Sequence, residues 1–157
     1  MNIRPATKQD IPAILQMIKD LAEYEKEPDA VENTEEMLEE TLFGDNPRAF
    51  AEIIEEDEPV GIAIWFLNYS TWTGKHGLYL EDLYVKPEVR GKGYGKQMLV
   101  HLAGKAVDNG WSRFEWWVLD WNKPAIDFYI SQGAQMMDEW TVCRVDGDAL
   151  HSLAAQR

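Results

Sequence analysis

The stretch VRGKGYGK, residues 89–96, sets glycines between basic side chains just ahead of an amphipathic run. The glycines and basic residues alternate as Arg90, Gly91, Lys92, Gly93, Tyr94, Gly95 and Lys96, with one tyrosine among them. Glycine permits positive φ and lets a ligand approach the backbone closely. Free N–H groups at the start of a helix attract an anion, helped by the helix dipole. We therefore predict an anion cradle here, with a tight strand-to-helix turn as the structural alternative.

Two common phosphate-binding motifs do not fit this loop. A P-loop reads G-x-x-x-x-G-K-[ST], but this chain has Arg90 in place of the first glycine and Gln97 in place of the Ser or Thr. A dinucleotide fingerprint reads G-x-G-x-x-G after the first strand of a βαβ unit, whereas this loop reads G-x-G-x-G in mid-chain. If the loop binds an anion, it therefore does so through a motif other than a P-loop or a dinucleotide fingerprint.

Two adjacent acids, Glu81 and Asp82, interrupt the otherwise apolar run YLEDLYV shortly before the glycine loop. A buried carboxylate is costly unless it is paired or has a function. Strict alternation would put Asp82 with Leu80 on one face of a strand, and Glu81 with Tyr79 on the other. A bulge could turn both acids toward one site, so we leave the face open. A paired structural role is the alternative.

The charge balance limits the classes of ligand. The chain has 157 residues and a formal net charge of −13, which disfavours a nucleic-acid partner because such a surface must neutralise phosphates. An acidic surface can steer a cationic ligand inward, or it can simply keep the protein in solution. The length is typical of one domain, and we expect a single domain over residues 1–157.

No apolar run approaches the ~20 residues needed to span a bilayer, and the N-terminus has no apolar signal region. We expect no membrane partner. The single cysteine, Cys143, excludes an internal disulfide and favours a reducing compartment, so we expect a cytoplasmic protein with Cys143 as a small buried residue. Three scattered histidines lack the spacing of metal ligands, and we expect no metal.

The elements that would position these residues alternate between strand and helix periodicity. A first strand covers NIRPA, and Thr7 with Asp10 resembles a capping box before an apolar helical face that starts at Ile11. A second helix, capped by Asn33 or Thr34, stops near Gly44.

The rest of the predicted order is a hairpin, a strand, a helix, a strand, a helix and a closing pair of strands. They cover AFAEIIEE with VGIAIWFLNY, GLYLEDLYV, the run from the glycine loop to Gly110, RFEWWVL, PAIDFYISQ, and AQMMD with WTVCRV. This order predicts an α/β chain with a mixed sheet.

The pattern R-G-x-G-x-G after a strand ending DLYVKPEV resembles the acetyl-CoA loop of the GNAT (general N-acetyltransferase) superfamily. The segments IRPAT, YLEDLYV and WNKPAIDFYISQGA also fall where that family has its matching segments. LAEYE, TWTGK and WNKPAIDFY resemble the spermidine/spermine and related diamine or thialysine acetyltransferases. The resemblance implies the GNAT fold, a mixed and mostly antiparallel central sheet of about six to seven strands flanked by about four helices.

The resemblance also implies a cofactor site for acetyl-CoA. The loop backbone from Arg90 to Lys96 would surround the pyrophosphate, and one N–H of the strand before it would face the thioester oxygen. The strand residues that would contact pantetheine are Leu83, Tyr84 and Val85. A second cofactor-contacting segment would comprise Asn122, Lys123, Pro124 and Ala125, for which an ordinary helix-start turn is the alternative.

Two catalytic roles follow from the same resemblance. Tyr129 matches the family's general acid, and a phenol with a pKa of about 10 is protonated at neutral pH and can donate to the leaving thiolate. Glu81 matches the position that contacts the amine, and we expect it to accept the amine proton through water. A core tyrosine is the alternative for Tyr129.

The amine pocket should be acidic and aromatic, because carboxylates and ring faces together hold ammonium groups. Its expected members are Tyr24, Glu25, Glu81, Asp82, Glu115, Trp116, Trp117 and, as a looser match, Asp138. At least one of the two tryptophans must face away from the site, because neighbouring strand residues alternate.

The leading interpretation is therefore an acetyl-CoA-dependent N-acetyltransferase acting on a small cationic amine, a polyamine or diamine. Thialysine, another amino acid or a protein lysine is the alternative acceptor, and an acyl-CoA-binding sensor without catalysis is the alternative class. The resembling enzymes are homodimers, so we expect a homodimer.

Overall fold

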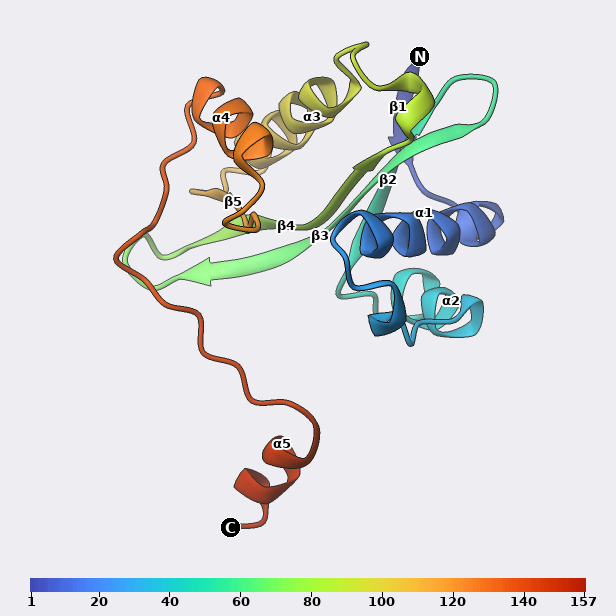
Figure 1. Cartoon of the computed structure of the whole chain (residues 1–157). Helices are drawn as coiled ribbons and strands as arrows, with labels where there is room; N and C mark the ends of the chain where they lie inside the picture. The colour runs from blue at the N-terminus through green and yellow to red at the C-terminus, as the bar shows by residue number, and fades with distance from the viewer. The chain divides into compact units, whose positions relative to one another are not determined.

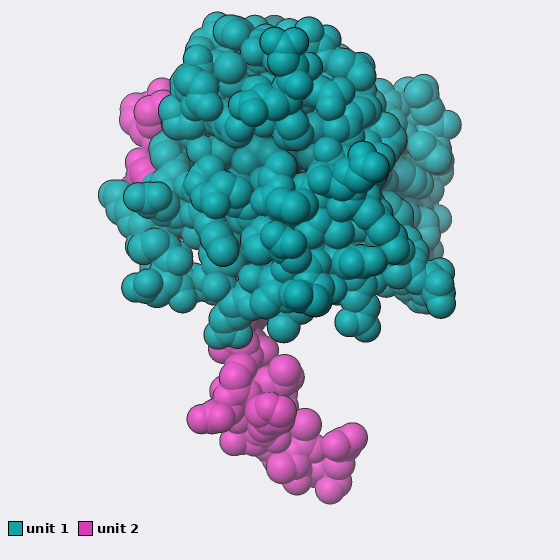
Figure 2. Space-filling model, turned by 90° about the vertical axis from the view of Figure 1, so that its right-hand side faces the viewer, with its two compact units in different colours: residues 1–117 teal, residues 118–157 magenta.

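The computed structural model describes the whole chain, residues 1–157. Residues 1–117 form one compact unit and residues 118–157 a second, and Figure 2 colours them separately. The helices and strands of the first unit are β1 (Asn2–Pro5), α1 (Ile11–Tyr24), α2 (Glu35–Phe43), β2 (Phe50–Glu55), β3 (Pro59–Ser70), β4 (Lys75–Val85), α3 (Tyr94–Asp108) and β5 (Phe114–Trp116). Its short 3₁₀ helices are η1 (Lys8–Asp10), η2 (Pro28–Ala30) and η3 (Pro87–Val89). The second unit contains α4 (Lys123–Ser131) and α5 (Gly147–Ala154).

The first unit is built on a five-stranded sheet with the order β1-β2-β3-β4-β5 (Figure 1). The pairs from β1 to β4 are antiparallel, and β4 pairs with β5 in parallel. This confirms the predicted α/β class with a mixed, mostly antiparallel sheet. The sheet has five strands, fewer than the six to seven predicted.

One face of the sheet is covered by α1 and α2, which we call the α1 face. Ile53 and Ile62 are paired across β2 and β3, and both are fully buried in the core formed with α1 and α2. The predicted capping box precedes α1, because Asp10 accepts from the backbone N–H and the hydroxyl of Thr7. Arg4 binds the same carboxylate with both terminal nitrogens at 2.8 and 2.9 Å, and this bonding holds the pKa of Asp10 near 2. The start of α1 is thereby tied to β1.

The opposite face of the sheet is covered by α3, which follows the glycine loop (Figure 1). Met98 and Leu102 of α3 are fully buried. Glu52 alternates with Ile53 on β2 and therefore points to this face, where its buried carboxylate lies 3.1 Å from the Nζ atom of Lys105. Core packing and this ion pair hold the axis of α3, and therefore its N-terminus, against the sheet.

The C-terminal part of the chain departs from the sequence prediction. The expected strand RFEWWVL is reduced to the three residues of β5. The segments AQMMD and WTVCRV form no strands, whereas α5, which was not predicted, covers residues 147–154. Cys143 is exposed rather than buried. An isolated alternating segment has no backbone partners of its own, so it cannot form a strand until another strand pairs with it.

No helix of the chain combines the length and the apolar character that crossing a membrane requires.

Candidate active site

The glycine loop between η3 and α3 has the conformation that its sequence predicts. Gly91 has φ 84° and Gly93 has φ 81°, and both lie in the left-handed region that favours glycine. A Cβ atom would meet nothing within 4 Å at either position, so glycine is needed there for its backbone conformation rather than for space. Gly93 caps α3, and the first intrahelical bond runs from Gln97 N–H to Gly93 C=O. The preceding N–H groups, those of residues 94–96, therefore remain available for an anion.

A residue outside the loop fixes its shape. Glu56, in the turn between β2 and β3, accepts from Lys92 Nζ at 2.9 Å and from the Tyr94 hydroxyl. These bonds lower the pKa of Glu56, the tyrosine bond most strongly, followed by the lysine bond. The loop therefore presents its backbone N–H groups while one of its three cations is held by an acid. Sequence reasoning missed Glu56, because nothing in the hairpin turn marks it as a partner of the loop.

The edge of β4 next to the loop is open. β5 pairs with β4 only from Leu78 to Leu80. Beyond Leu80, residues 82–85 pair with β3 on one side and with no strand on the other. Backbone groups along this edge, which include those of Leu83 and the N–H of Val85, are available to an extended ligand that runs toward the glycine loop, whereas the Val85 carbonyl accepts from Arg90 Nε.

The two acids of β4 lie at a β-bulge. Asp82 pairs with Ile64, whereas Leu80 pairs with the next residue of β3, Trp65, so Glu81 is the extra residue between them. Ile64 belongs to the core on the α1 face, and Trp65 faces α3, where Lys105 lies over its ring. Asp82 and Leu80 therefore lie on opposite faces. Strict alternation would place them together, and the bulge is the physical reason for the difference.

A third acid, Glu25 at the C-terminal end of α1, joins the acids of the bulge. Burial raises the pKa of Asp82 to about 6, with further contributions from the charges of Glu81 and Glu25. Burial, and then the charge of Glu81, also raises the pKa of Glu25. We call Glu25, Glu81 and Asp82 the acidic cluster. Since these neighbouring charges oppose the ionisation of Asp82 and Glu25, the cluster favours either a bound proton or a bound cation.

Aromatic and polar side chains on β3–β5 continue this surface. Tyr79 pairs with Glu115 on β5, and the edge of the Trp117 ring meets the Tyr79 ring at 5.9 Å. Burial, followed by the charges of Glu81 and Glu115, raises the pKa of Tyr79. Asn68 donates to Glu115 at 2.9 Å and fixes its carboxylate.

Of the two tryptophans, Trp116 pairs with Leu80 and therefore points away from Glu115. Trp117 is thus the tryptophan that shares a side with the acidic cluster. Asn68 and Tyr79 were missing from the predicted site, and their alternation with other residues of this face could have identified them.

The remaining predicted site residues belong to the second unit. The Asn122 side chain caps α4 by accepting from Ala125 N–H, and Pro124 stands in the first turn. Lys123 forms an ion pair with Asp127 at 3.0 Å on the same helix. Tyr129 lies further along α4, and its role as proton donor stays a prediction. Asp138 is exposed in the segment without regular structure, and its place in the amine pocket also stays a prediction.

Comparison with known proteins identifies the family. Residues 13–134 match the Acetyltransferase (GNAT) family. A thialysine N-epsilon-acetyltransferase from Sus scrofa is 44% identical over 166 residues, covering 98% of this chain and 97% of that protein. An L-ornithine N5-acetyltransferase from Arabidopsis thaliana is 32% identical over 198 residues, covering 97% of this chain and 87% of that protein. Among solved structures, an integron cassette protein from V. cholerae superposes with a TM-score of 0.81 at 26% identity, covering 98% of this chain and 96% of the other.

The chain therefore belongs to the GNAT acetyltransferase family and is an acyltransferase. The family uses acetyl-CoA, and the glycine loop fits that molecule, because its exposed N–H groups at a helix N-terminus suit a pyrophosphate.

Proposed function

We propose that this enzyme transfers an acetyl group from acetyl-CoA to a primary amine of a small aliphatic molecule, by direct attack while both substrates are bound. The acidic cluster at the bulge of β4 is the observation that carries the proposal. The charge of Glu81 raises the pKa of both Glu25 and Asp82, the charge of Glu25 also raises the pKa of Asp82, and a bound ammonium group relieves that repulsion. The rings of Tyr79 and Trp117 supply the aromatic surface that often accompanies a bound ammonium.

The amine must lose a proton before it attacks. Alkyl ammonium groups resemble the lysine side chain, whose pKa is about 10.4, so a base must accept that proton near neutral pH. Glu81, exposed at the bulge, accepts it through water in this proposal. Asp82 supports the transfer, because a carboxyl with a pKa of about 6 can take up or release a proton near neutrality.

The chain's residues have defined tasks toward acetyl-CoA, which supplies the acetyl thioester. The loop backbone of residues 90–96 holds the pyrophosphate, and the free edge of β4 holds the pantetheine arm. Residues 122–125 give a second contact. An N–H of residues 83–85 stabilises the oxyanion, and Tyr129 protonates the leaving thiolate.

Two kinds of acceptor have support. The thialysine and ornithine acetyltransferases among the relatives favour the side-chain amine of a basic amino acid. A human spermidine/spermine N(1)-acetyltransferase-like protein, 36% identical over 98% of this chain and 24% of its own length, favours a polyamine or diamine. The acids on one side of the sheet, which extend from the cluster to Glu115, also suit a molecule with several cations.

The experiment that tests this proposal is the release of CoA thiol from acetyl-CoA with each of a set of amines. The set contains thialysine, L-ornithine, putrescine, spermidine and a lysine peptide. We expect thiol release that depends on a small amine. Binding of acetyl-CoA without thiol release from any amine would instead indicate a sensor, and turnover of the peptide alone would indicate a protein acetyltransferase.

The resemblance to dimeric enzymes supports a homodimer, and the single cysteine supports a cytoplasmic location. The scattered histidines, which lack the spacing of metal ligands, support activity without a metal. Light scattering at micromolar concentration should give the mass of two chains, and the mass of one chain would contradict this expectation.

A further inference from the structure

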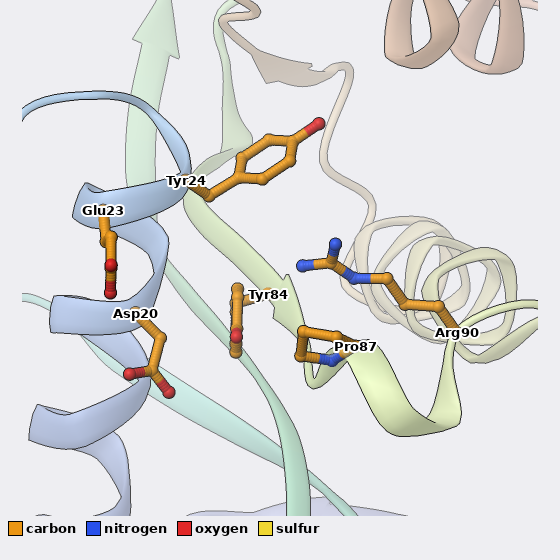
Figure 3. Close-up of a pocket in the computed structure, with 6 residues that line it drawn as sticks. All are labelled: Asp20, Glu23, Tyr24, Tyr84, Pro87 and Arg90. Atoms are coloured by element: carbon orange, nitrogen blue, oxygen red, sulfur yellow. The ribbon is translucent and has the colours of Figure 1, made fainter.

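A cavity of about 400 Å³ includes Tyr24, the sequence neighbour of Glu25 in the acidic cluster, and the steps proposed above use backbone groups of its lining but none of its side chains. It is lined by Asp20, Glu23, Tyr24, Tyr84, Pro87 and Arg90. Figure 3 shows the first three side chains on α1, with Tyr84 on β4 and Arg90 reaching across from the loop that follows η3. We call this cavity the head-group pocket. Asp20, Glu23 and Tyr24 share a helix face, because their spacing is i, i+3 and i+4.

The Arg90 side chain is held in place by contacts that leave its binding edge free. Its Nε atom donates to the carbonyl oxygen of Val85 at 3.0 Å. Its guanidinium lies over the rings of Tyr24 and Tyr84, at 5.3 and 5.6 Å from their centroids. It forms no ion pair with Asp20 or Glu23, and neither terminal nitrogen has a hydrogen-bond acceptor. A fixed guanidinium with a free pair of donors matches the two oxygens of a carboxylate.

Carboxylates gather on the other side of the same pocket. Charges of both signs act on the Tyr84 hydroxyl. Burial raises its pKa most, and the negative charges of Asp20, Glu88 and Glu23 raise it further, whereas the positive charge of Arg90 lowers it. A pocket that presents a guanidinium opposite two carboxylates offers one site for an anion and one for a cation. The ammonium and carboxylate of an α-amino acid carry these two charges on a single carbon atom.

The spacing to the acidic cluster fits the side chain of such an amino acid. Tyr84 and Asp82 are two residues apart on β4 and share the α1 face, which separates their Cα atoms by roughly 7 Å. An extended chain of four or five single bonds, as from the Cα atom of ornithine or lysine to its terminal nitrogen, spans roughly 5–6 Å. A molecule with its head group at Arg90 would therefore bring its side-chain amine to the bulge.

We propose that the head-group pocket binds the α-amino-acid head of the acceptor, with Arg90 on the carboxylate and Asp20 and Glu23 on the α-ammonium. The proposal rests on the proposed function, since it assigns the amine end to the acidic cluster. It makes the acceptor a free amino acid with a side-chain amine, rather than a polyamine.

Three substrates that differ by one group test this assignment. Putrescine is L-ornithine without the carboxylate, and 5-aminopentanoate is L-ornithine without the α-ammonium. The measured quantity is the ratio of kcat/KM between two substrates in the same variant, because a general cofactor defect cancels in that ratio. Arg90→Gln should lower the ornithine-to-putrescine ratio roughly ten- to a hundredfold, the usual effect of a charge-assisted contact. Asp20→Asn and Glu23→Gln should lower the ornithine-to-5-aminopentanoate ratio instead.

Lys86→Gln is the matched control, because Lys86 precedes Pro87 of the pocket in the sequence, but its ammonium is bonded to Glu58 and does not line the cavity. It should leave both ratios within about twofold. A raised KM for acetyl-CoA in Arg90→Gln with an unchanged ornithine-to-putrescine ratio would overturn the assignment, since Arg90 would then serve only the cofactor. Improved putrescine turnover with unchanged ornithine turnover would also overturn it, by marking a polyamine pocket that Arg90 fills.

Calorimetric titration of L-ornithine into the CoA-bound protein separates this assignment from the proposed function. We expect binding that Arg90→Gln weakens at least tenfold. If ornithine binds in this way but no amine is acetylated, the proposed function fails while the pocket assignment stands. Absence of ornithine binding at millimolar concentration would overturn the pocket assignment even if other amines are acetylated.

Discussion

Replacing Asp82 with asparagine should make the protein more stable and less active at neutral pH. The pKa of Asp82 rises from 3.8 to about 6 in the folded chain, through burial first and then through the charges of Glu81 and Glu25. Each pKa unit corresponds to about 1.4 kcal/mol, so ionised Asp82 costs the folded state about 3 kcal/mol at pH 7.5. Asparagine has nearly the same shape and no charge. Its stabilising effect should therefore approach that value.

The sign of the pH dependence follows from the raised pKa. Below about pH 3 the side chain is largely protonated in both states and costs little. As the pH rises from about 3 to 6 the unfolded chain loses the proton first, so the folded state loses stability, and above about pH 6 the cost is nearly complete. The gain from Asp82→Asn should thus be about 3 kcal/mol at pH 7.5 and only about 1 kcal/mol at pH 4.5.

Urea denaturation of both proteins at pH 7.5 and 4.5 measures this gain directly. Asp57→Asn, an exposed change in the β2–β3 turn, is the control and should stay within about 0.5 kcal/mol of the wild type at both pH values. Turnover of the best amine should fall in Asp82→Asn, because the cluster loses a charge and a titrating group. Equal gains at the two pH values, or a loss of stability at pH 7.5, would refute the electrostatic account of the cluster.

Three further predictions concern the two substrate sites. Gly93→Val should raise the KM for acetyl-CoA much more than that for the amine, because a β-branched residue at φ 81° is strained and its side chain blocks the backbone, and an unchanged cofactor KM in a folded variant would disprove anchoring there. Tyr129→Phe should lower kcat roughly 10²–10⁴-fold, and a higher pH should not recover this loss. A higher pH should partly restore the activity of Glu81→Gln, so identical pH responses of the two variants would contradict the assigned roles. Glu25→Gln should raise the amine KM but leave acetyl-CoA binding intact, and the wild-type amine KM should rise with salt; turnover that is insensitive to salt would count against an electrostatic pocket.

Local signals made the loop and the helices predictable. The glycine loop, the capping box at Thr7 and the cap at Thr34 each depend on a few neighbouring residues, and the structure places all three as predicted. The bulge was harder to predict from the sequence, because Glu81 becomes the extra residue only through the register between β3 and β4. Sequence alternation alone could not decide which face Asp82 occupies.

The features that could not be predicted from the sequence depend on contacts between segments that are distant in the chain. Alternation in residues 134–145 is typical of strands, but a strand also needs a partner backbone, which the sequence of the segment does not specify. The sequence places Arg90 in the anion loop, and that assignment stays a prediction. In the structure its guanidinium also lies over the ring of Tyr24, 66 positions away, a contact that the sequence does not indicate. The spacing of Asp20, Glu23 and Tyr24 was visible in the sequence, although nothing linked it to Arg90.

The most direct measurement of the central claim is the identity of the product formed from acetyl-CoA and L-ornithine. NMR of that product reports which nitrogen carries the acetyl group. With the head group at Arg90 and the side-chain amine at the acidic cluster, the acetyl group should be found on the side-chain nitrogen alone. Acetylation of the α-nitrogen, or release of CoA thiol with no acetylated amine, would contradict the account.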